Sequence, residues 1–102
     1  MVREIALFRL KTGLTEQALA SLEQYAAFKR TQPGCRSAAV NPMLRDPALP
    51  YLDAHAVLLY TEFDDLKCLT ECSRALQQHF QLRQAPFQNM IIGQPTYGIF
   101  QD

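Results

Sequence analysis

Alternating and helically spaced apolar positions divide the chain into six segments. Alternation typical of strands covers about residues 3–11, 35–40, 54–63 and 89–100, and apolar residues at helical spacing cover about 15–32 and 66–84. The order is therefore strand, helix, strand, strand, helix, strand. This β-α-β-β-α-β order predicts a ferredoxin-like α+β fold, in which right-handed crossovers place both helices on one face of a four-stranded antiparallel sheet.

Capping and turn residues mark the ends of the two predicted helices. Thr15 is placed to cap the first helix, and Pro33-Gly34 is placed to end it. Asp64-Asp65 is placed to cap the second helix, and Pro86 ends it. Apolar positions of the first helix form one stripe, and the remaining charged and polar residues are expected to face water: Glu16, Glu23, Gln24 and Lys29.

Apolar residues occupy both faces of the first, third and fourth strands. In the first strand, Ile5 and Leu7 point one way, whereas Ala6, Phe8 and Leu10 point the other way. Two helices cover only one face of the sheet, so the second apolar face needs another surface. A second copy serves both chains at once, because the contact is isologous. We therefore expect residues 1–102 to form a single domain that pairs into a homodimeric α/β barrel.

Proline and glycine distinguish two further segments. Gly93 and Pro95 place the last strand at an edge of the sheet, with a bend near Pro95, because proline gives no ladder donor. Residues 41–50 hold three of the six prolines and predict a long, stiff loop. Loops of this length are often lids or binding elements, and a plain surface insertion is an equally good interpretation.

Charge and cysteine content exclude several classes of function. Ten basic and ten acidic residues give zero net charge, which argues against a surface for nucleic acid or an anionic membrane. The longest apolar run, residues 54–60, is too short to span a membrane. Three cysteines suit reduced thiols in a cytoplasmic protein. Cys68 and Cys72 lie four apart on the second helix and so present a possible metal pair, but small buried side chains are the commoner interpretation, and we expect no metal or cofactor.

Four short signatures carry a resemblance to a known family. They are residues 4–11 (Glu-Ile-Ala-Leu-Phe-Arg-Leu-Lys), Gln32-Pro33-Gly34, His55 at the start of the third strand, and Glu62-Phe63-Asp64. In this order and spacing the chain resembles the stress-responsive dimeric α/β-barrel family along nearly its full length. Antibiotic-biosynthesis monooxygenases and haem-degrading enzymes are sister families on the same fold.

The resemblance implies a divided set of activities. Some members look like polyketide cyclases, which use a histidine in the first strand and a Tyr-x-x-His-Pro-x-His stretch in the second helical region. The matching positions here are Glu4 and residues 69–75, Leu-Thr-Glu-Cys-Ser-Arg-Ala, so the cyclase side chains are missing. The chain also has no Trp, which argues against the Asn-Trp-His set of the haem-degrading relatives. Cofactor-free oxidation of a bound aromatic molecule survives as the rival enzymatic hypothesis.

The candidate site residues are few. His55, where the family usually has histidine, is the candidate for proton transfer, but a structural hydrogen bond at the strand end is the commoner interpretation. Four residues near the helices are candidates for a ligand pocket: Tyr25, Phe28, His79 and Phe80. We expect a homodimeric small-molecule-binding protein whose apolar pocket, between sheet and helices, takes an aromatic or polyketide-like ligand, with weak cyclase or lyase activity. The alternatives are a cofactor-free monooxygenase and a ligand-free assembly or stress-response module.

Overall fold

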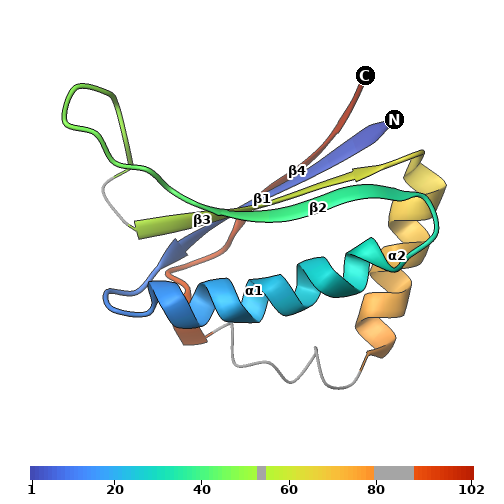
Figure 1. Ribbon diagram of the computed structural model, residues 1–102, viewed down its shortest axis with the longest axis horizontal. Helices are drawn as coiled ribbons and strands as arrows, with labels where there is room; N and C mark the ends of the chain where they lie inside the picture. The colour runs from blue at the N-terminus through green and yellow to red at the C-terminus, as the bar shows by residue number, and fades with distance from the viewer. Residues whose placement is uncertain (53–54, 80–88) are drawn as a thin grey trace.

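The chain folds into a four-stranded antiparallel sheet and two helices. The computed structural model describes residues 1–52, 55–79 and 89–102 (Figure 1). The elements follow the predicted order: β1 (Val2–Leu10), α1 (Thr15–Arg30), β2 (Cys35–Pro42), β3 (His55–Phe63), α2 (Leu66–Gln78) and β4 (Thr96–Gln101). The strands lie in the order β2-β3-β1-β4. The ferredoxin-like prediction is therefore confirmed.

Both helices lie on one side of the sheet, which leaves the other side open. Figure 1 shows α1 beneath the sheet and α2 beneath the end where the chain termini lie, and the strand order places β4 at the outer edge, beside β1. Alternation along each strand then assigns every side chain to one of two faces. We call these the helix-covered face and the open face.

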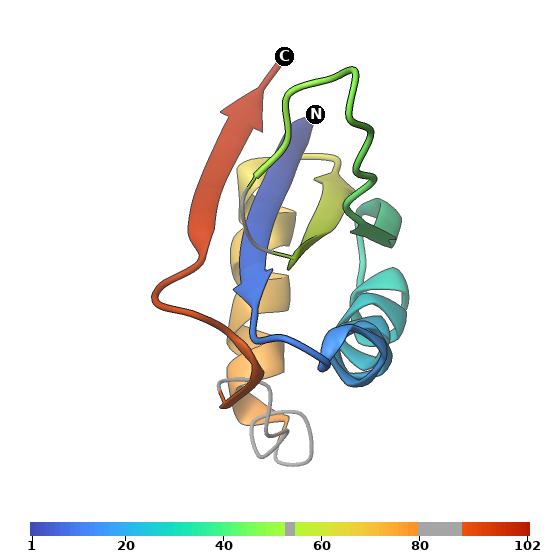
Figure 2. The ribbon, with the colours of Figure 1, turned by 90° about the vertical axis from the view of Figure 1, so that its left-hand side faces the viewer.

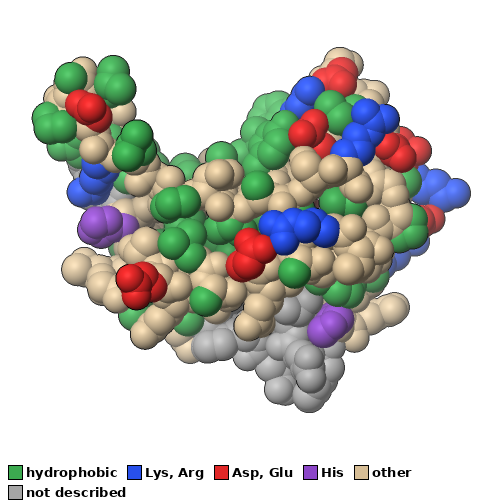
Figure 3. Space-filling view, in the orientation of Figure 1, with side chains coloured by type: hydrophobic (Ala, Val, Ile, Leu, Met, Phe, Trp, Pro, Cys, Tyr) green, Lys and Arg blue, Asp and Glu red, His purple; other side chains and the backbone are tan. Residues whose placement is uncertain are grey.

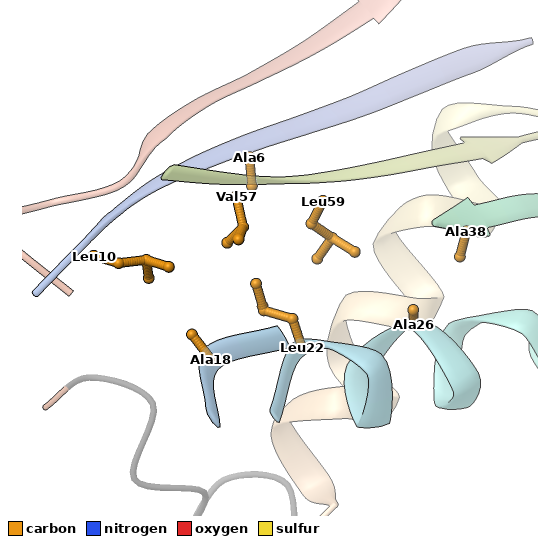
Figure 4. Packing of buried hydrophobic residues seen from close by; sticks show 8 residues of the cluster. All are labelled: Ala6, Leu10, Ala18, Leu22, Ala26, Ala38, Val57 and Leu59. Atoms are coloured by element: carbon orange, nitrogen blue, oxygen red, sulfur yellow. The ribbon is translucent and has the colours of Figure 1, made fainter. Parts of the chain in front are cut away.

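The apolar core lies between the sheet and α1 (Figure 4). Leu10, Val57 and Leu59 point from the sheet toward Leu22, and all four are at most 5% exposed. Alanine at the helix positions facing the sheet lets α1 approach it closely. A second buried cluster joins the sheet to α2 and consists of Val2, Phe63, Leu69 and Cys72.

Capping of the two helices differs from the prediction at α1 and agrees with it at α2. Leu14 precedes the first turn of α1, and no side chain caps that turn, so the prediction for Thr15 is wrong: Thr15 is already the first helical residue. Asp65 caps α2 as predicted, because its Oδ1 accepts a hydrogen bond from the Cys68 amide at 2.8 Å.

Helix α2 ends earlier than its apolar spacing suggests. The helix stops at Gln78, whereas the prediction extended it to about residue 84. His79 adopts an extended backbone, and its ring packs edge-on against Phe28 with ring centres 5.0 Å apart. This tertiary contact overrides the helical periodicity at that point. The rest of the predicted helix, residues 80–84, lies outside the described residues.

Strand β4 is shorter than predicted but lies at an edge as expected. It begins only at Thr96, directly after Pro95. Gly93 has a φ of 68°, a conformation that favours glycine and interrupts an extended chain. Before that interruption, Ile91 makes an isolated bridge with Leu10 and packs on the core of the helix-covered face. Ile91 therefore does not belong to the open face.

The open face combines an apolar centre with a charged end. By alternation, Ile5 and Leu7 of β1 and Leu58 and Tyr60 of β3 share this face, and all four are only partly buried. Near the chain termini the charged side chains pair with one another: Arg3 with Asp102, Arg3 with Glu62 at 3.9 Å, and Arg36 with Asp64 at 2.6 Å.

A long loop rises beside the open face. Residues 43–52, which we call the arm, extend away from the helices at the end of the sheet opposite the chain termini (Figure 1). Figure 3 shows the hollow between the arm and the charged end in profile. The open face is therefore concave along the strands.

Candidate functional site

A buried carboxylate on β1 organises the main polar cluster of the helix-covered face. Glu4 is 7% exposed and lies directly opposite Thr61 of β3, which is fully buried. On its other side, Glu4 pairs in register with Ile99 of β4. Alternation along β1 points Glu4 toward the helices, because its neighbours on that face, Val2 and Ala6, are both buried there.

Three donors from three different elements surround this carboxylate. Glu4 Oε1 accepts from the Lys29 ammonium at 2.5 Å and from the Thr61 hydroxyl at 2.8 Å. Glu4 Oε2 accepts from the Tyr97 hydroxyl at 2.5 Å. Lys29 comes from the last turn of α1 and is itself only 7% exposed. We call these four residues the Glu4 cluster.

The partners of Glu4 stabilise its ionised form, although burial disfavours a charge. Removal from water would raise the pKa of the carboxyl group, but attraction to Lys29 and hydrogen bonds from Lys29, Tyr97 and Thr61 outweigh that effect. The pKa of Glu4 therefore lies below its ordinary value. Glu4 is ionised at neutral pH, which makes it a strong hydrogen-bond acceptor and a weak base.

Tyr97 connects the cluster to the surface. The residue as a whole is 53% exposed, yet its hydroxyl lies against the buried carboxylate. Partial burial and the hydrogen bond to Glu4 both raise the pKa of Tyr97 above its ordinary value, so the phenol keeps its proton. That proton is directed at Glu4, which leaves the lone pairs of the phenol oxygen to accept a hydrogen bond from another molecule.

Apolar side chains flank Tyr97 on the same face. Ile99 is 42% exposed on β4, and Phe8 of β1 is half-buried against the core. Helix α1 lies on the opposite side of β1 from this strand (Figure 2). The arrangement thus places one polar hydrogen-bonding group within an apolar and aromatic surface, a combination typical of small-molecule sites.

The buried thiols near the cluster are kept in their neutral form. Burial raises the pKa of Cys72 and of Cys35, while the nearby Lys29 charge opposes the shift in both. Both residues therefore behave as protonated, apolar side chains. This agrees with the interpretation of Cys72 as a small buried residue, which is 3% exposed. Within residues 1–52, 55–79 and 89–102 no group of three or more His, Cys, Asp and Glu side chains is placed to hold a metal ion.

The structure places His55 away from the Glu4 cluster. His55 is the first residue of β3, pairs in register with Leu10 and is exposed. Glu4 lies six positions along β1 from Leu10, so His55 and the cluster occupy opposite ends of the sheet. A catalytic role for His55 stays a prediction, and such a role would not involve Glu4.

The predicted pocket residues are brought together only in part. Phe28 and His79 are in edge-to-face contact, which joins the end of α1 to the end of α2. Tyr25, one turn earlier on α1, is half-buried against the core, and burial raises its pKa. Phe80 lies outside the described residues. A pocket walled by these side chains stays a prediction.

An open groove of about 420 Å³ lies elsewhere, at the outer edge of β2. Arg30 closes part of this edge, because its Nε donates to the Ala38 carbonyl at 2.9 Å. Among the residues that the structure describes, the lining consists of Arg30, Cys35, Arg36, Ser37 and Ala38, and it includes neither Tyr25, Phe28 nor His79.

Sequence reasoning missed the Glu4 cluster for two identifiable reasons. Lys29 was assigned to the solvent side of α1, but the structure turns it inward, so that prediction is wrong. A Lys in the last turn of a helix is usually interpreted as a favourable charge near the helix C-terminus, and nothing local indicates a buried acidic partner. Alternation along β1 is the available signal, because it places Glu4 on the same face as Val2 and Ala6, and a buried carboxylate needs a partner.

Comparison with known proteins identifies the fold class. No protein-family model matches the sequence, and no curated protein matches it. Solved structures do match along nearly the whole chain, and they share its ferredoxin-like α+β fold. The fold and the element order of this chain are those of that class.

Three of these structures show the extent of the similarity. A putative antibiotic biosynthesis monooxygenase from Nitrosomonas europaea has a TM-score of 0.78 and 14% identity, over 99% of this chain and 88% of the other. SnoaB from Streptomyces nogalater, a cofactor-independent oxygenase, has a TM-score of 0.71 and 16% identity, over 99% and 91%. Rv0793 from Mycobacterium tuberculosis has a TM-score of 0.72 and 18% identity, over 99% and 93%.

Neither of the two described helices is long and apolar enough to cross a membrane. Both helices instead carry buried faces that pack against the sheet.

Proposed function

We propose that the protein is a cytoplasmic homodimer of the stress-responsive α/β-barrel type that binds a small aromatic or polyketide-like molecule on the helix-covered face of its sheet. The observation that carries this proposal is the Glu4 cluster. Glu4 and Lys29 form a buried ion pair, the half-exposed Tyr97 donates its hydroxyl to that pair, and the partly exposed Ile99 lies beside Tyr97 on the same face of β4.

The polar groups define the ligand that suits the site. The Tyr97 oxygen is available as an acceptor, so the ligand offers a hydroxyl group as donor. The adjoining Ile99 and Phe8 favour an aromatic body beside that hydroxyl. A phenol or enol on a flat polycyclic frame satisfies both requirements.

Dimerisation is the second part of the proposal and rests on the open face. Ile5, Leu7, Leu58 and Tyr60 form an apolar strip that neither helix covers. The charged side chains near the chain termini pair within the chain, which lowers the cost of covering that end of the face.

A weak cyclase or lyase activity would rely on Glu4 as its base. The ring closure needs a group that removes a proton next to a carbonyl. Glu4 stands where the cyclase-like relatives have histidine, and Tyr97 is placed to pass a proton to it. The lowered pKa of Glu4 makes this base weak, so any turnover is slow.

A second candidate function is a cofactor-independent monooxygenase. The names of two structural neighbours, SnoaB and the Nitrosomonas protein, favour it. In this reaction the substrate binds as the enol tautomer of a ring CH₂ ketone, and its hydroxyl proton passes to Tyr97 as Tyr97 passes its own proton to Glu4. The resulting anion forms a C–O bond to O₂ at the former CH₂ carbon, and the peroxide takes the proton back. Loss of the remaining hydrogen from that carbon breaks the O–O bond, so one oxygen atom stays as C=O and the other leaves as water.

Thermal-shift titration with 1,8-dihydroxyanthraquinone tests the binding proposal. We expect the compound to raise the melting temperature of the wild type and to lose most of this effect in Tyr97→Phe, which keeps the ring and removes the hydroxyl. Tyr25→Phe is the matched control, because Tyr25 belongs to the other predicted pocket. Loss of the shift in Tyr25→Phe alone would place the ligand against α1 instead. No shift in any protein would favour a ligand-free assembly module.

Oxygen consumption with 1,8-dihydroxyanthrone separates the two candidate functions. A monooxygenase converts this anthrone to the anthraquinone with uptake of one O₂ per molecule, faster than the uncatalysed reaction. A binding protein leaves the uncatalysed rate unchanged, although it binds the compound.

A further inference from the structure

The arm carries exposed apolar side chains on a rigid frame. Leu44 is 87% exposed, Leu49 is 64% exposed and Tyr51 is 51% exposed. Such a concentration of exposed apolar groups on one short loop is unfavourable in water.

Local interactions hold this loop in shape. The Leu49 amide donates to the Asp46 carbonyl at 3.0 Å, and the Ala48 amide donates to Asp46 Oδ1 at 2.8 Å, which together close a turn. Arg45 lies over the Tyr51 ring at 5.2 Å and donates to the Leu52 carbonyl at 3.0 Å. The arm therefore presents its leucines without a large further loss of conformational entropy on binding.

The shape of the open face limits how a second copy fits against it. The arm at one end and the charged end at the other make the face concave along the strands (Figure 3). Two concave faces fit together when the strands of one copy cross those of the other. The arm and the charged end of each copy then pass beside the edges of the opposite sheet. The arm then meets an edge strand of the partner.

Twofold symmetry leaves two choices for that edge strand. When the two sheets cross, the twofold axis lies between them and runs along one of the two diagonals between the strand directions. On one diagonal both arms meet the β2 edge of the opposite copy, and on the other both meet the β4 edge. The β2 edge carries Arg30 and Arg36, and Arg30 already occupies the Ala38 carbonyl. The β4 edge carries Tyr97, Ile99 and Phe100, which are each at least 42% exposed. Apolar arm residues suit the second edge.

We infer that the arm of each protomer packs against β4 of the second copy and covers the exposed side of its Tyr97 and Ile99. This inference rests on the proposed homodimer and extends it, because the ligand site of one chain is completed by Leu44 and Leu49 of the other. The occupant of the β4 edge is thus a second copy of this chain.

Filtered NOE measurements on a mixed dimer test the arrangement. One protomer carries ¹³C-labelled Leu and Ile methyl groups, and the other is unlabelled. We expect cross-protomer NOEs from the methyls of Leu44 and Leu49 to the ring of Tyr97. NOEs from the arm to β2 of the partner would overturn the inference and leave the dimer intact, as would an arm without any cross-protomer NOE. A monomeric wild type would overturn both proposals.

Hydrogen exchange of an arm variant gives a second measurement. In the Leu44→Ser/Leu49→Ser double variant the open faces still hold the dimer, and β4 amides are expected to exchange about tenfold faster than in the wild type. Amides of β1 and β3 serve as the internal reference. Unchanged exchange in β4 of a dimeric variant would contradict the inference.

Discussion

The two faces of the sheet solve the same problem, apolar strands in water, in different ways. On the helix-covered face, Leu10, Val57 and Leu59 are buried within one chain, and the buried carboxylate of Glu4 has its ionic and hydrogen-bonding partners. On the open face, Leu7 and Leu58 stay partly exposed and charges pair only at one end. The first face buries its apolar side chains within one chain, whereas the second leaves an apolar strip exposed, which we propose a second copy covers.

Substitution on the open face gives the largest expected effect. Leu58→Asp places a charge at the centre of the apolar strip, where dimer contact would remove it from water. We expect light scattering at micromolar concentration to change from twice the chain mass to the mass of one chain, or to show aggregates. Leu66→Asp on α2 is the matched control, because Leu66 is 55% exposed on the helical side of the sheet. The mass of this variant in light scattering should stay that of a dimer. A monomeric wild type would contradict the proposal that the open face, unlike the helix-covered face, is covered by a second copy.

Removal of the buried carboxylate gives the next largest effect. Glu4→Ala leaves the Lys29 ammonium buried without a counter-charge, which typically costs about 3–5 kcal/mol of folding free energy. Urea unfolding measures this loss. The comparison on the open face is Arg36→Ala, which breaks an exposed ion pair and should leave the unfolding midpoint nearly unchanged. Equal effects of the two substitutions would show that the two faces do not differ in this way.

The pH dependence of stability gives a smaller but more specific effect. The pKa of Glu4 is lower in the folded chain than its ordinary value of 4.5, so its stabilising contribution is fully present above that value and is lost as the pH falls through the native pKa. We expect the unfolding free energies of the wild type and of Glu4→Gln to differ at pH 7 and to converge in acid. A constant difference across this range would mean that the charge of Glu4 contributes nothing.

The architecture could be predicted from the sequence because alternating and helically spaced apolar residues mark the sides of strands and helices that become buried. The observed order of strands and helices confirms this prediction. The predictions of the ferredoxin-like order of strands and helices, of the edge position of β4 and of the Asp65 cap are all confirmed. The errors lie where distant contacts override local preference. His79 leaves the helix to pack against Phe28, and Lys29 turns inward toward a residue 25 positions away in sequence.

The candidate site was harder to predict than the fold. The sequence favours histidines as candidates, because imidazole titrates near neutral pH and the resemblance places a histidine at the start of β3. The position aligned with the histidine of the first strand holds Glu4, and its meaning depends on Lys29, Thr61 and Tyr97, which only the sheet register and the packing of α1 bring together.

The most direct test of the account is an NMR titration of the labelled protein with 1,8-dihydroxyanthraquinone. The account predicts that the largest shifts fall on Tyr97, Ile99 and the residues around Glu4, while Leu58 and Leu7 on the open face change little. Shifts centred on the open face, or on His55 at the far end of the sheet, would contradict the assignment of the ligand site to the helix-covered face.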